Sequence, residues 1–419
     1  MRAKFISFLN HPLVSGSSVL FFGTLFANIF NLLFTLFMTA NLSVRDYGIV
    51  ASLISMISLT AYGANALIPT IVQFAGKFFA NQDLGSIRSL YEKIGLFLIS
   101  VAIMIFLTLI IFIKPLGAFF NISDPLLFII TDLTILLGFL IVLNNAMLQA
   151  KISFHAVSII SILGTSSKLI FAIVFINLGL GTKGAALALL IAAFLPFLFS
   201  FLPLKEIFKK HNYKQVINIK EIIGYSIPSV LGTLALTSFV TNDIIWVKHF
   251  FNEYNAGLYA GLSTVGRIIF FFTSPIGMAM FPLIVRKHNK GESYTSTLLI
   301  ALGIVFFSSL SLTILYYLYP NFVVLHVLHR KEYLAITPQL AMFALSITIY
   351  SVLSIMVYFY FSIRITKIFF PLLIGAFLQV VLLTFFHDSL SQIITITLSI
   401  ELLLLVGLLL YYPYATKKK

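Results

Sequence analysis

The sequence predicts an all-α polytopic membrane protein, with about 12 transmembrane helices in two six-helix repeats around a central cavity. Composition, recurring apolar stretches and an internal repeat support this class. Of the 419 residues, 60% are hydrophobic and only 10% are charged, whereas about a quarter of residues are charged in soluble domains. Apolar stretches of about 18 or more residues recur along the chain, each long enough to cross roughly 30 Å of hydrocarbon.

The apolar stretches define the expected spans, and short connections make neighbouring spans antiparallel. The expected spans are residues 16–40, 48–72, 94–113, 126–148, 155–178 and 184–204, followed by 222–249, 257–281, 296–318, 336–360, 367–386 and 390–412. The first stretch is longer than the apolar core of a signal peptide, so we expect it to be retained as a span. The longest internal loops are expected at residues 73–93 and 205–221, and both are basic.

The distribution of Lys and Arg predicts the orientation. If both termini are cytoplasmic, 19 of the 27 basic residues lie inside, six lie outside and two lie within spans. Cytoplasmic loops carry an excess of Lys and Arg, so both termini are expected in the cytoplasm. The net charge of +14 therefore lies in short loops, and we expect no nucleic-acid partner.

The two halves of the chain share short sequence elements in addition to hydropathy. Gly23-Thr24-Leu25 recurs as Gly232-Thr233-Leu234, and Pro69-Thr70-Ile71-Val72 is similar to Pro282-Leu283-Ile284-Val285. Chance similarity between two strings rich in Phe and Leu is the alternative. A parallel repeat occurs in several transporter folds. We therefore expect an N-terminal six-helix lobe at residues 1–210 and a C-terminal six-helix lobe at residues 211–419.

Two repeat-equivalent spans carry polar residues at helical spacing, which marks a face that avoids lipid. The first stripe comprises Thr24, Asn28, Asn31, Thr35 and Thr39, and the second comprises Ser226, Ser229, Thr233, Thr237 and Thr241. Hydrogen bonds between helices would explain such stripes. The alternative, which their length favours, is that both stripes line one water-filled cavity.

Two cations, Lys168 and Arg267, lie near mid-membrane on comparable polar stripes. A charge at this depth costs about 2.5–3.5 kcal/mol on insertion scales, so it is usually functional or offset by a partner. We expect both to bind an anionic substrate in the cavity. A structural ion pair with Asp243, Asp132 or Glu401 is the alternative.

Three acids in the spans have different expected environments. Asp243 and Asp132 lie near the outer ends of their spans, so interfacial exposure is expected for both. Glu401 interrupts a Leu-rich run near the middle of the last span, one turn after Thr397. Because desolvation disfavours a charged carboxylate, Glu401 is expected to be neutral, and it is a candidate for proton or other ion coupling.

The sequence contains none of the familiar signatures of soluble enzymes. It has no cysteine, no phosphate-binding Gly-rich loop, no HExxH and no nucleophile elbow, and His326 and His329 are too isolated to suggest zinc. We therefore expect no catalytic residues, no cofactor and no metal, and a protein that is not an enzyme.

Two short elements carry a resemblance to a known family. Leu42-Ser43-Val44-Arg45-Asp46-Tyr47-Gly48-Ile49-Val50 follows the first span, and Ala256-Gly257-Leu258-Tyr259-Ala260 follows the seventh. With Pro282 at the end of the eighth span, these elements resemble the polysaccharide transporter family, the O-antigen-type flippases of the multidrug/oligosaccharidyl-lipid/polysaccharide (MOP) superfamily. The chain departs from the related peptidoglycan-precursor flippases, which have arginines in their first span and commonly fourteen spans.

The resemblance implies a flippase for an undecaprenyl-diphosphate-linked oligosaccharide, an O-antigen or capsule-type repeat unit, in the bacterial cytoplasmic (inner) membrane. The implied partners are this lipid-linked oligosaccharide, membrane lipid and polysaccharide-assembly proteins. Lys168 and Arg267 would bind the diphosphate and the polar stripes would bind sugar hydroxyls, while the lobes expose the cavity to each side in turn.

Three other functions remain open. A drug/cation antiporter of the same superfamily would need carboxylates at the centre of its cavity. A membrane glycan polymerase would need a large external loop, whereas the longest external stretch here, residues 319–335, is short. The third is a purely structural membrane component.

Overall fold

The computed structural model describes residues 12–42, 44–120, 122, 124–209, 219–251, 253–328 and 331–416. All regular structure in these ranges is helical. The chain forms two compact units, Met1–Ile219 and Lys220–Lys419, each with its own set of packed helices. The expected lobe boundary at residues 210 and 211 lies outside the described residues.

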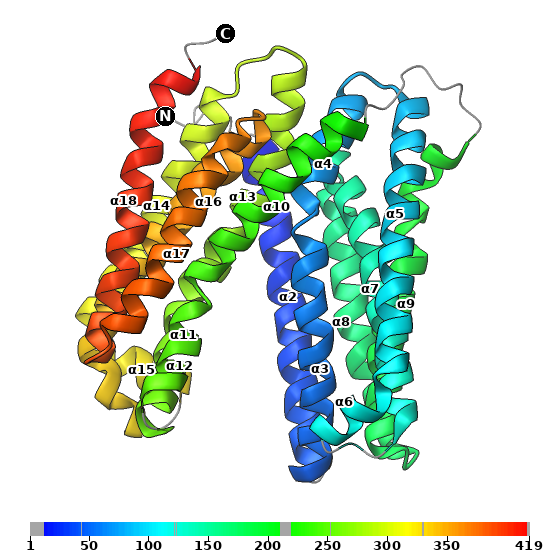
Figure 1. Cartoon of the computed structure of the whole chain (residues 1–419), viewed down its shortest axis with the longest axis vertical. Coiled ribbons are helices and arrows are strands. Elements are labelled where there is room, and N and C mark those ends of the chain that lie inside the picture. Colours follow the sequence, from blue (N-terminus) through cyan, green and yellow to red (C-terminus); the bar gives the residue numbers. More distant parts are fainter. Residues whose placement is uncertain are drawn as a thin grey trace. The chain divides into compact units, whose positions relative to one another are not determined.

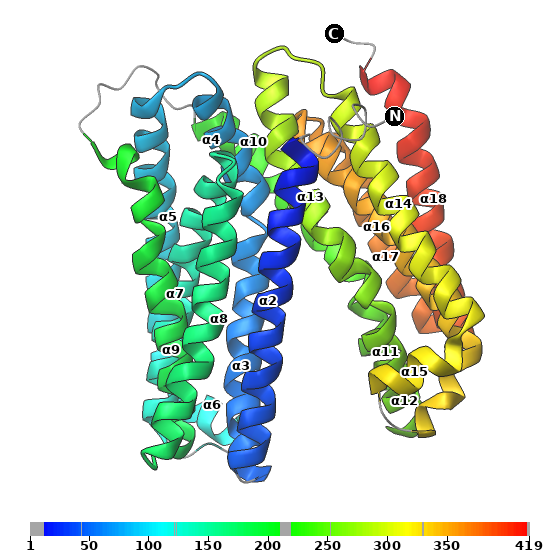
Figure 2. The same ribbon diagram turned by 180° about the vertical axis from the view of Figure 1, so that it is seen from behind.

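In the N-terminal unit, long helices lie side by side along most of their length (Figure 1). The helices of this unit are α2 (Pro12–Asn41), α3 (Val44–Asn65), α4 (Ile68–Ala80), α5 (Leu84–Ile111), α6 (Ile113–Phe120), α7 (Pro125–Ala150), α8 (Phe154–Asn177) and α9 (Gly181–Ser200), followed by the 3-10 helix η1 (Leu202–Phe208). Helix α8 packs against both α2 and α9, as the turned view in Figure 2 shows.

The C-terminal unit also consists of long helices, but two of its spans are interrupted. Its helices are α10 (Ile219–Phe239), α11 (Asn242–Phe250), α12 (Glu253–Gly266), α13 (Ile268–Asn289), α14 (Thr295–Leu318), α15 (Pro320–Leu328), α16 (Thr337–Ser362), α17 (Phe369–Phe385) and α18 (Leu390–Thr416), with 3-10 helices η2 (Lys331–Ile336) and η3 (Thr366–Ile368). Helix α16 packs against α13, α14 and α18, so it forms the centre of this unit.

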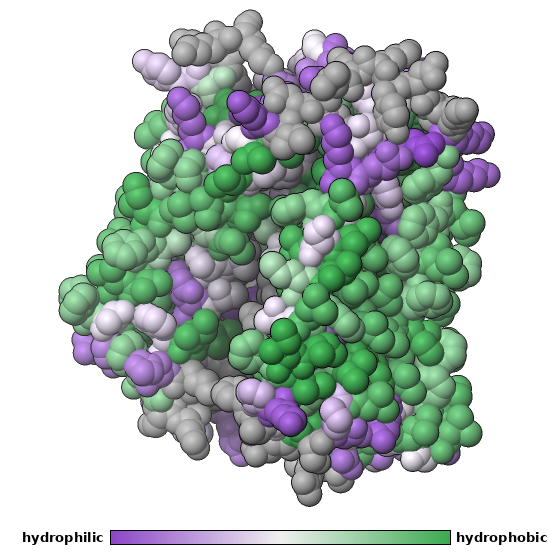
Figure 3. Space-filling model, turned by 45° about the vertical axis from the view of Figure 1, so that its right-hand side comes forward, coloured by the Kyte–Doolittle hydropathy of each residue, from purple (hydrophilic) through white to green (hydrophobic). Residues whose placement is uncertain are grey.

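The predicted class is confirmed. Within the described ranges, 11 helices are long and apolar enough to cross a membrane. The expected second span, residues 48–72, falls on α3 and the start of α4, and the chain turns between these helices at residues 66–67. Large apolar side chains such as Leu96, Phe307, Phe377 and Leu410 are exposed on the helix surfaces. On the face in Figure 3, hydrophobic residues form a broad middle band and hydrophilic residues gather mainly toward the two ends.

The expected internal loop at residues 73–93 is wrong. Helix α4 continues to Ala80, and α5 begins at Leu84 after a short turn. Asp83 caps α5, because its carboxylate accepts hydrogen bonds from Ser86 N at 3.1 Å and Ser86 Oγ at 2.7 Å. The hydropathy pattern ends where the charged residues begin, whereas the helices continue beyond the apolar layer.

The repeated glycines Gly23 and Gly232 both lie at close helix contacts. A Cβ atom on Gly23 would collide with Ser158 of α8. A Cβ atom on Gly232 would come within 2.6 Å of the Phe361 ring in α16. The Gly-Thr-Leu elements therefore place a residue without a side chain where α2 and α10 approach their neighbours.

Candidate functional site

The C-terminal unit contains a buried cluster of polar side chains around Asp243. This residue lies in the first turn of α11 and is only 3% exposed. Its Oδ2 accepts a hydrogen bond from Tyr259 Oη at 2.9 Å, and its Oδ1 lies 3.6 Å from Arg267 Nη2. Arg267 also donates a hydrogen bond to the Val240 carbonyl. The cluster thus combines an acid, a cation and a phenol at membrane depth.

Two helix interruptions position this cluster. Helix α10 ends at Phe239 and α11 begins at Asn242, so the chain turns at residues 240–241. Helix α12 ends at Gly266 and α13 begins at Ile268, which leaves Arg267 between them. Interrupted helices leave backbone carbonyls without partners in their own helix. Arg267 binds one of these carbonyls, that of Val240, so the interruption and the cation stabilise each other.

Glu401 of α18 lies beside this cluster and is fully buried. Its Oε2 accepts a hydrogen bond from Ser346 Oγ of α16 at 2.7 Å, while Oε1 has no hydrogen-bond partner in the described part of the chain. Asp243, Tyr259, Ser346 and Glu401 line one small cavity of about 10 Å³. This volume is close to the minimum for one water molecule.

A third buried polar group, Gln379 of α17, joins the same region. Its Nε2 donates to the Phe239 carbonyl at 3.1 Å and to Thr397 Oγ1 at 3.2 Å. Its Oε1 accepts from Asn242 Nδ2 at 3.2 Å. Gln379 therefore binds the second free carbonyl at the α10–α11 turn, and it links α17 to α10, α11 and α18.

The chemistry of this region is that of two buried acids near one cation. The ion pair with Arg267 offsets the charge of Asp243, but no ion pair to Glu401 occurs among the described residues. A buried carboxylate without a counter-charge is unfavourable unless it holds a proton or a bound cation. The polar side chains that line the cavity, Asp243, Tyr259, Ser346, Thr397 and Glu401, offer only oxygen atoms as cation ligands, and hard cations prefer oxygen. The described residues contain no cluster of three His, Cys, Asp or Glu side chains that would indicate a transition-metal site.

The N-terminal unit places Lys168 of α8 against α2. Its Nζ donates a hydrogen bond to Asn31 Oδ1 and lies 4.4 Å from the centre of the Phe34 ring. No carboxylate in the described ranges lies within 4.0 Å of this ammonium. Two predicted residues, Lys168 and Asn31, are thus brought together, and the cation is held by an amide and an aromatic face.

The hydroxyl groups of the predicted polar stripes bond mainly within their own helices. Where the structure shows their hydroxyl bonds, the acceptor is a carbonyl of the same helix: Thr35 to Asn31, Ser226 to Ile222, Thr233 to Ser229, Thr237 to Thr233, and Thr241 to Thr237. Thr24 is half-buried, Asn28 is exposed and Ser229 is buried. The Thr39 side chain lies outside the described part. The bonds shown for these hydroxyls thus stay within one helix, whereas Asn31 of the first stripe accepts a hydrogen bond from Lys168 of α8.

Three expectations for charged residues need correction or refinement. Asp243 is buried, not exposed at the interface, because the α10–α11 turn redirects it toward Tyr259 and Arg267. Asp132 of α7 is also buried, at 2% exposure, and neither of its carboxylate oxygens has a hydrogen-bond partner among the described residues. Arg267 forms an ion pair with Asp243, which the sequence analysis gave as the alternative to substrate binding.

The sequence interpretation missed Tyr259, Ser346, Gln379 and Asn242 as members of this network. Gln379 carried a usable signal, since it is the only amide in the very apolar helix α17. Tyr259 and Ser346 carried none, because single hydroxyls are common in membrane helices. Their role depends on which face each helix turns toward Asp243 and Glu401.

Comparison with solved structures shows which fold this arrangement belongs to. An outward-facing multidrug resistance MATE family transporter of the MOP superfamily matches with a TM-score of 0.78 and 16% identity, over 97% of this chain and 96% of the other. A mutant of the Vibrio cholerae MATE transporter VcmN matches with a TM-score of 0.77 and 14% identity, over 97% of each chain. These similarities establish a MATE-like fold with its two-repeat arrangement.

Sequence comparisons identify a related membrane protein and a protein family. The uncharacterized membrane protein MJ1375 of Methanocaldococcus jannaschii is 23% identical over 262 residues, which cover 59% of this chain and 62% of that protein. The sequence model of the family described as "Polysaccharide biosynthesis protein" matches residues 37–338. The chain therefore belongs to this polysaccharide biosynthesis protein family, and it is built on the fold of the MATE transporters of the MOP superfamily.

Proposed function

We propose that this protein is a flippase that moves an undecaprenyl-diphosphate-linked oligosaccharide, such as an O-antigen or capsule repeat unit, from the cytoplasmic to the outer leaflet. A diphosphate that carries a glycan cannot cross hydrocarbon unaided. Family membership supports a substrate from polysaccharide biosynthesis. The MATE-like fold supports alternating access of two repeats.

The observation that carries the proposal is the environment of Lys168. An ammonium has three N–H donors, and the described residues supply one hydrogen-bond acceptor, Asn31 Oδ1, and the face of Phe34. No acid of the described part neutralises the charge. A phosphate oxygen would supply both a counter-charge and further acceptors, as in other charge-assisted hydrogen bonds. We therefore assign Lys168 to the substrate head group.

Arg267 and Glu401 have a different part in the proposal. Arg267 is already paired with Asp243, although about a quarter of its side chain remains exposed. An anionic head group would compete with Asp243 for the guanidinium. Loss of that pair would leave Asp243 and Glu401, which share one cavity, to take up a proton or a cation. This exchange would couple ion uptake to substrate binding.

The test is deletion of the gene with complementation, scored by the leaflet in which the lipid-linked glycan accumulates. A flippase defect leaves the intact lipid-linked unit in the cytoplasmic leaflet. A polymerase defect leaves single units in the outer leaflet instead, and that result would exclude the proposal. Complementation with Lys168→Ala should fail, whereas Lys205→Ala, which removes an exposed lysine of η1, should restore surface glycan.

A drug/cation antiporter is the second candidate, and the burial of Asp243 and Glu401 favours it. Two membrane-depth carboxylates in one unit are the groups that an organic cation or its exchanged ion would require. Efflux of cationic dyes from a drug-sensitive strain tests this candidate. Efflux that Lys168→Ala leaves intact but Glu401→Gln abolishes would favour the antiporter over the flippase.

A further inference from the structure

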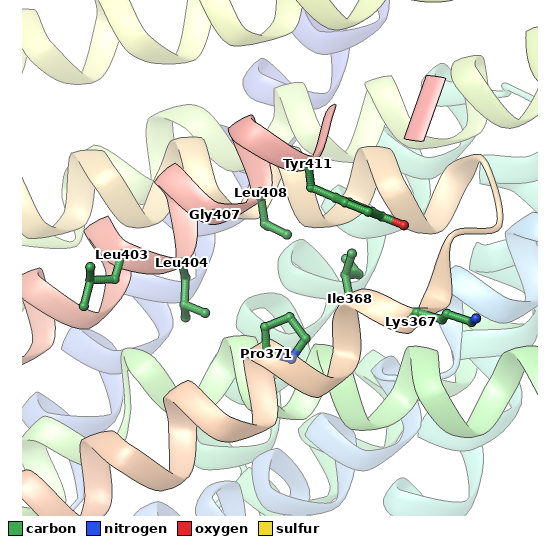
Figure 4. Close-up of a pocket in the computed structure, with 8 residues that line it drawn as sticks. All are labelled: Lys367, Ile368, Pro371, Leu403, Leu404, Gly407, Leu408 and Tyr411. Carbon is green, nitrogen blue, oxygen red and sulfur yellow. The ribbon is translucent and has the colours of Figure 1, made fainter. Parts of the chain in front are cut away.

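A groove runs between α17 and α18 in the C-terminal unit and has a volume of about 420 Å³ (Figure 4). Leu403, Leu404 and Leu408 of α18 face Pro371 and Ile368 across it. Neighbouring side chains on the same helices, including Phe370, Ile374 and Leu410, are exposed. The groove therefore opens on a surface that the apolar spans α17 and α18 present to lipid.

Two glycines explain why this groove exists. A Cβ atom on Gly375 of α17 would come within 2.8 Å of Leu404 Cδ1, so the two helices touch at that level. A Cβ atom on Gly407 of α18 would meet nothing within 4 Å. The helices are thus in contact at Gly375 and separate toward Gly407, where the missing side chain leaves the groove open.

One end of the groove is polar and positively charged. Figure 4 shows Lys367 and Tyr411 at the same end, with the ammonium and the phenol oxygen directed away from the leucines. Both residues also line an adjoining cavity of about 410 Å³, together with His288, Arg364 and Tyr414. The apolar groove and the polar cavity are therefore continuous at Lys367 and Tyr411.

The charge at this end is not balanced. Arg364 pairs with Glu221 at 2.7 Å, which fixes it at the edge of the cavity. Lys367 is exposed, and no carboxylate in the described ranges lies within 4.0 Å of its Nζ. Among the described residues, no acid lines either cavity. Thr366, Tyr411 and Tyr414 line the same cavity as Lys367, and their hydroxyl groups can donate further hydrogen bonds to a bound anion.

We propose that this groove binds an anionic phospholipid of the cytoplasmic leaflet, with its phosphate at Lys367 and one acyl chain along Pro371, Leu404 and Gly407. The apolar lining at bilayer depth selects a lipid chain over a free phosphate. The unbalanced cation selects an anionic head group over a zwitterionic one, since each basic residue near the surface contributes attraction to anionic lipid. The positive-inside distribution assigns this end to the cytoplasm. The proposal does not depend on the flippase function.

Binding is measured by native mass spectrometry of the purified full-length chain in detergent, titrated with phosphatidylglycerol or with phosphatidylcholine of the same acyl chains. Wild type should bind phosphatidylglycerol more tightly, and Lys367→Gln should reduce this preference about fivefold. Gly407→Leu places its Cβ atom in open space and extends a side chain into the groove, so it should weaken binding of both lipids alike. The matched controls are Lys331→Gln, at an exposed lysine of η2, and Gly303→Leu, at another open glycine on α14.

Three results would overturn the proposal. Equal affinity of wild type for the two lipids would remove the role of the charge. Equal losses in Gly407→Leu and Gly303→Leu would show that the groove is not the site. Effective competition by glycerol 3-phosphate would show that the acyl chain is not recognised. Lys367→Gln changes an exposed side chain, so it remains informative even if Gly407→Leu does not fold.

Discussion

Arg267 and Asp243 face each other across two interrupted spans, with 3.6 Å between Nη2 of the guanidinium and Oδ1 of the acid. Asp243 follows the turn between α10 and α11, and Arg267 occupies the turn between α12 and α13. The pair therefore links two positions at which the helices are not continuous. Disruption of the pair should therefore affect both interruptions at once.

Asp243→Asn should destabilise the protein by about 3 kcal/mol, the low end for a broken buried ion pair, since it leaves the partly buried Arg267 cation without a counter-charge. Chemical unfolding of the purified protein measures this change. The double variant with Arg267→Met should be less destabilised than the two single variants added together. Asp388→Asn, at an exposed acid, serves as the control. Additive effects in the double variant would show that the pair contributes nothing.

Lys168→Met should lower the rate of transport without lowering the stability of the protein. Loss of a charged hydrogen bond to phosphate should lower transport about tenfold or more. Stability should stay the same or rise, because the variant removes a desolvated charge that no described acid neutralises. Lys168→Arg should retain part of the activity. Flux of the lipid-linked glycan and thermal unfolding are measured side by side, and a parallel loss of both would indicate a structural lysine.

Glu401→Gln should abolish the pH dependence of transport. The amide oxygen still accepts the Ser346 hydrogen bond, so the variant keeps the local packing and loses only the ionisable group. Transport in proteoliposomes is measured across a pH series for wild type, Glu401→Gln and the control Glu206→Gln, an exposed acid of η1. If Glu401→Gln retains the wild-type pH profile, ion coupling does not run through this residue.

Asp124 gives a pH-dependent contribution to the stability of the N-terminal unit. The hydrogen bond from Lys183 lowers the pKa of the Asp124 carboxyl, and a backbone hydrogen bond from Leu126 acts in the same direction. A lowered pKa means that this stability is fully present above the unfolded-state pKa of about 4, and is lost as the pH falls through the folded-state pKa.

Asp124→Asn should therefore lower the melting temperature at pH 7, and its difference from wild type should vanish in strong acid. The expected change is small, because the ion pair of 3.0 Å lies at the surface. Asp388→Asn again provides the control. If Asp124→Asn still has a lower melting temperature than wild type at low pH, the charge of Asp124 is not the cause of the difference.

Gly232→Ala should destabilise the protein by about 1–3 kcal/mol, since the new methyl group collides with the fully buried Phe361 ring. Gly224→Ala lies on the same helix, with nothing within 4 Å of the added Cβ atom. The stability of this control variant should be unchanged or slightly higher, because Ala has a higher helix propensity than Gly. Equal unfolding midpoints for the two variants would contradict the close contact between α10 and α16.

The spans themselves were predictable, whereas the interruptions within them were not. An apolar helix in lipid must satisfy its own backbone, so apolar length alone locates spans such as α7 and α8. No proline or glycine lies within four residues of the turn at residues 240–241. It depends on Arg267 and Gln379, which bind the carbonyls that it frees. Contacts made by residues so distant in sequence leave no local pattern.

The candidate site was predictable in its residue types and not in its pairings. Lys168, Arg267 and Glu401 were conspicuous, because charge within a span is costly. The burial of Asp243 was missed, since a helical wheel assumes that α10 and α11 form one straight helix. Asp132 was missed for another reason: its position near the outer end of α7 suggested exposure, whereas neighbouring helices cover it.

The hydroxyl bonds of α10 have a consequence for molecular recognition. Ser226, Thr233 and Thr237 of α10, and Thr241 just after it, each donate their hydroxyl proton to a backbone carbonyl one turn earlier, so only their oxygen lone pairs are left to bind another molecule. These lone pairs accept from any donor and dictate no stereochemistry, because they tolerate a wide range of approach angles. A polyol beside α10 would be held without its epimers being told apart, which makes this helix suited to cargo of varied sugar composition.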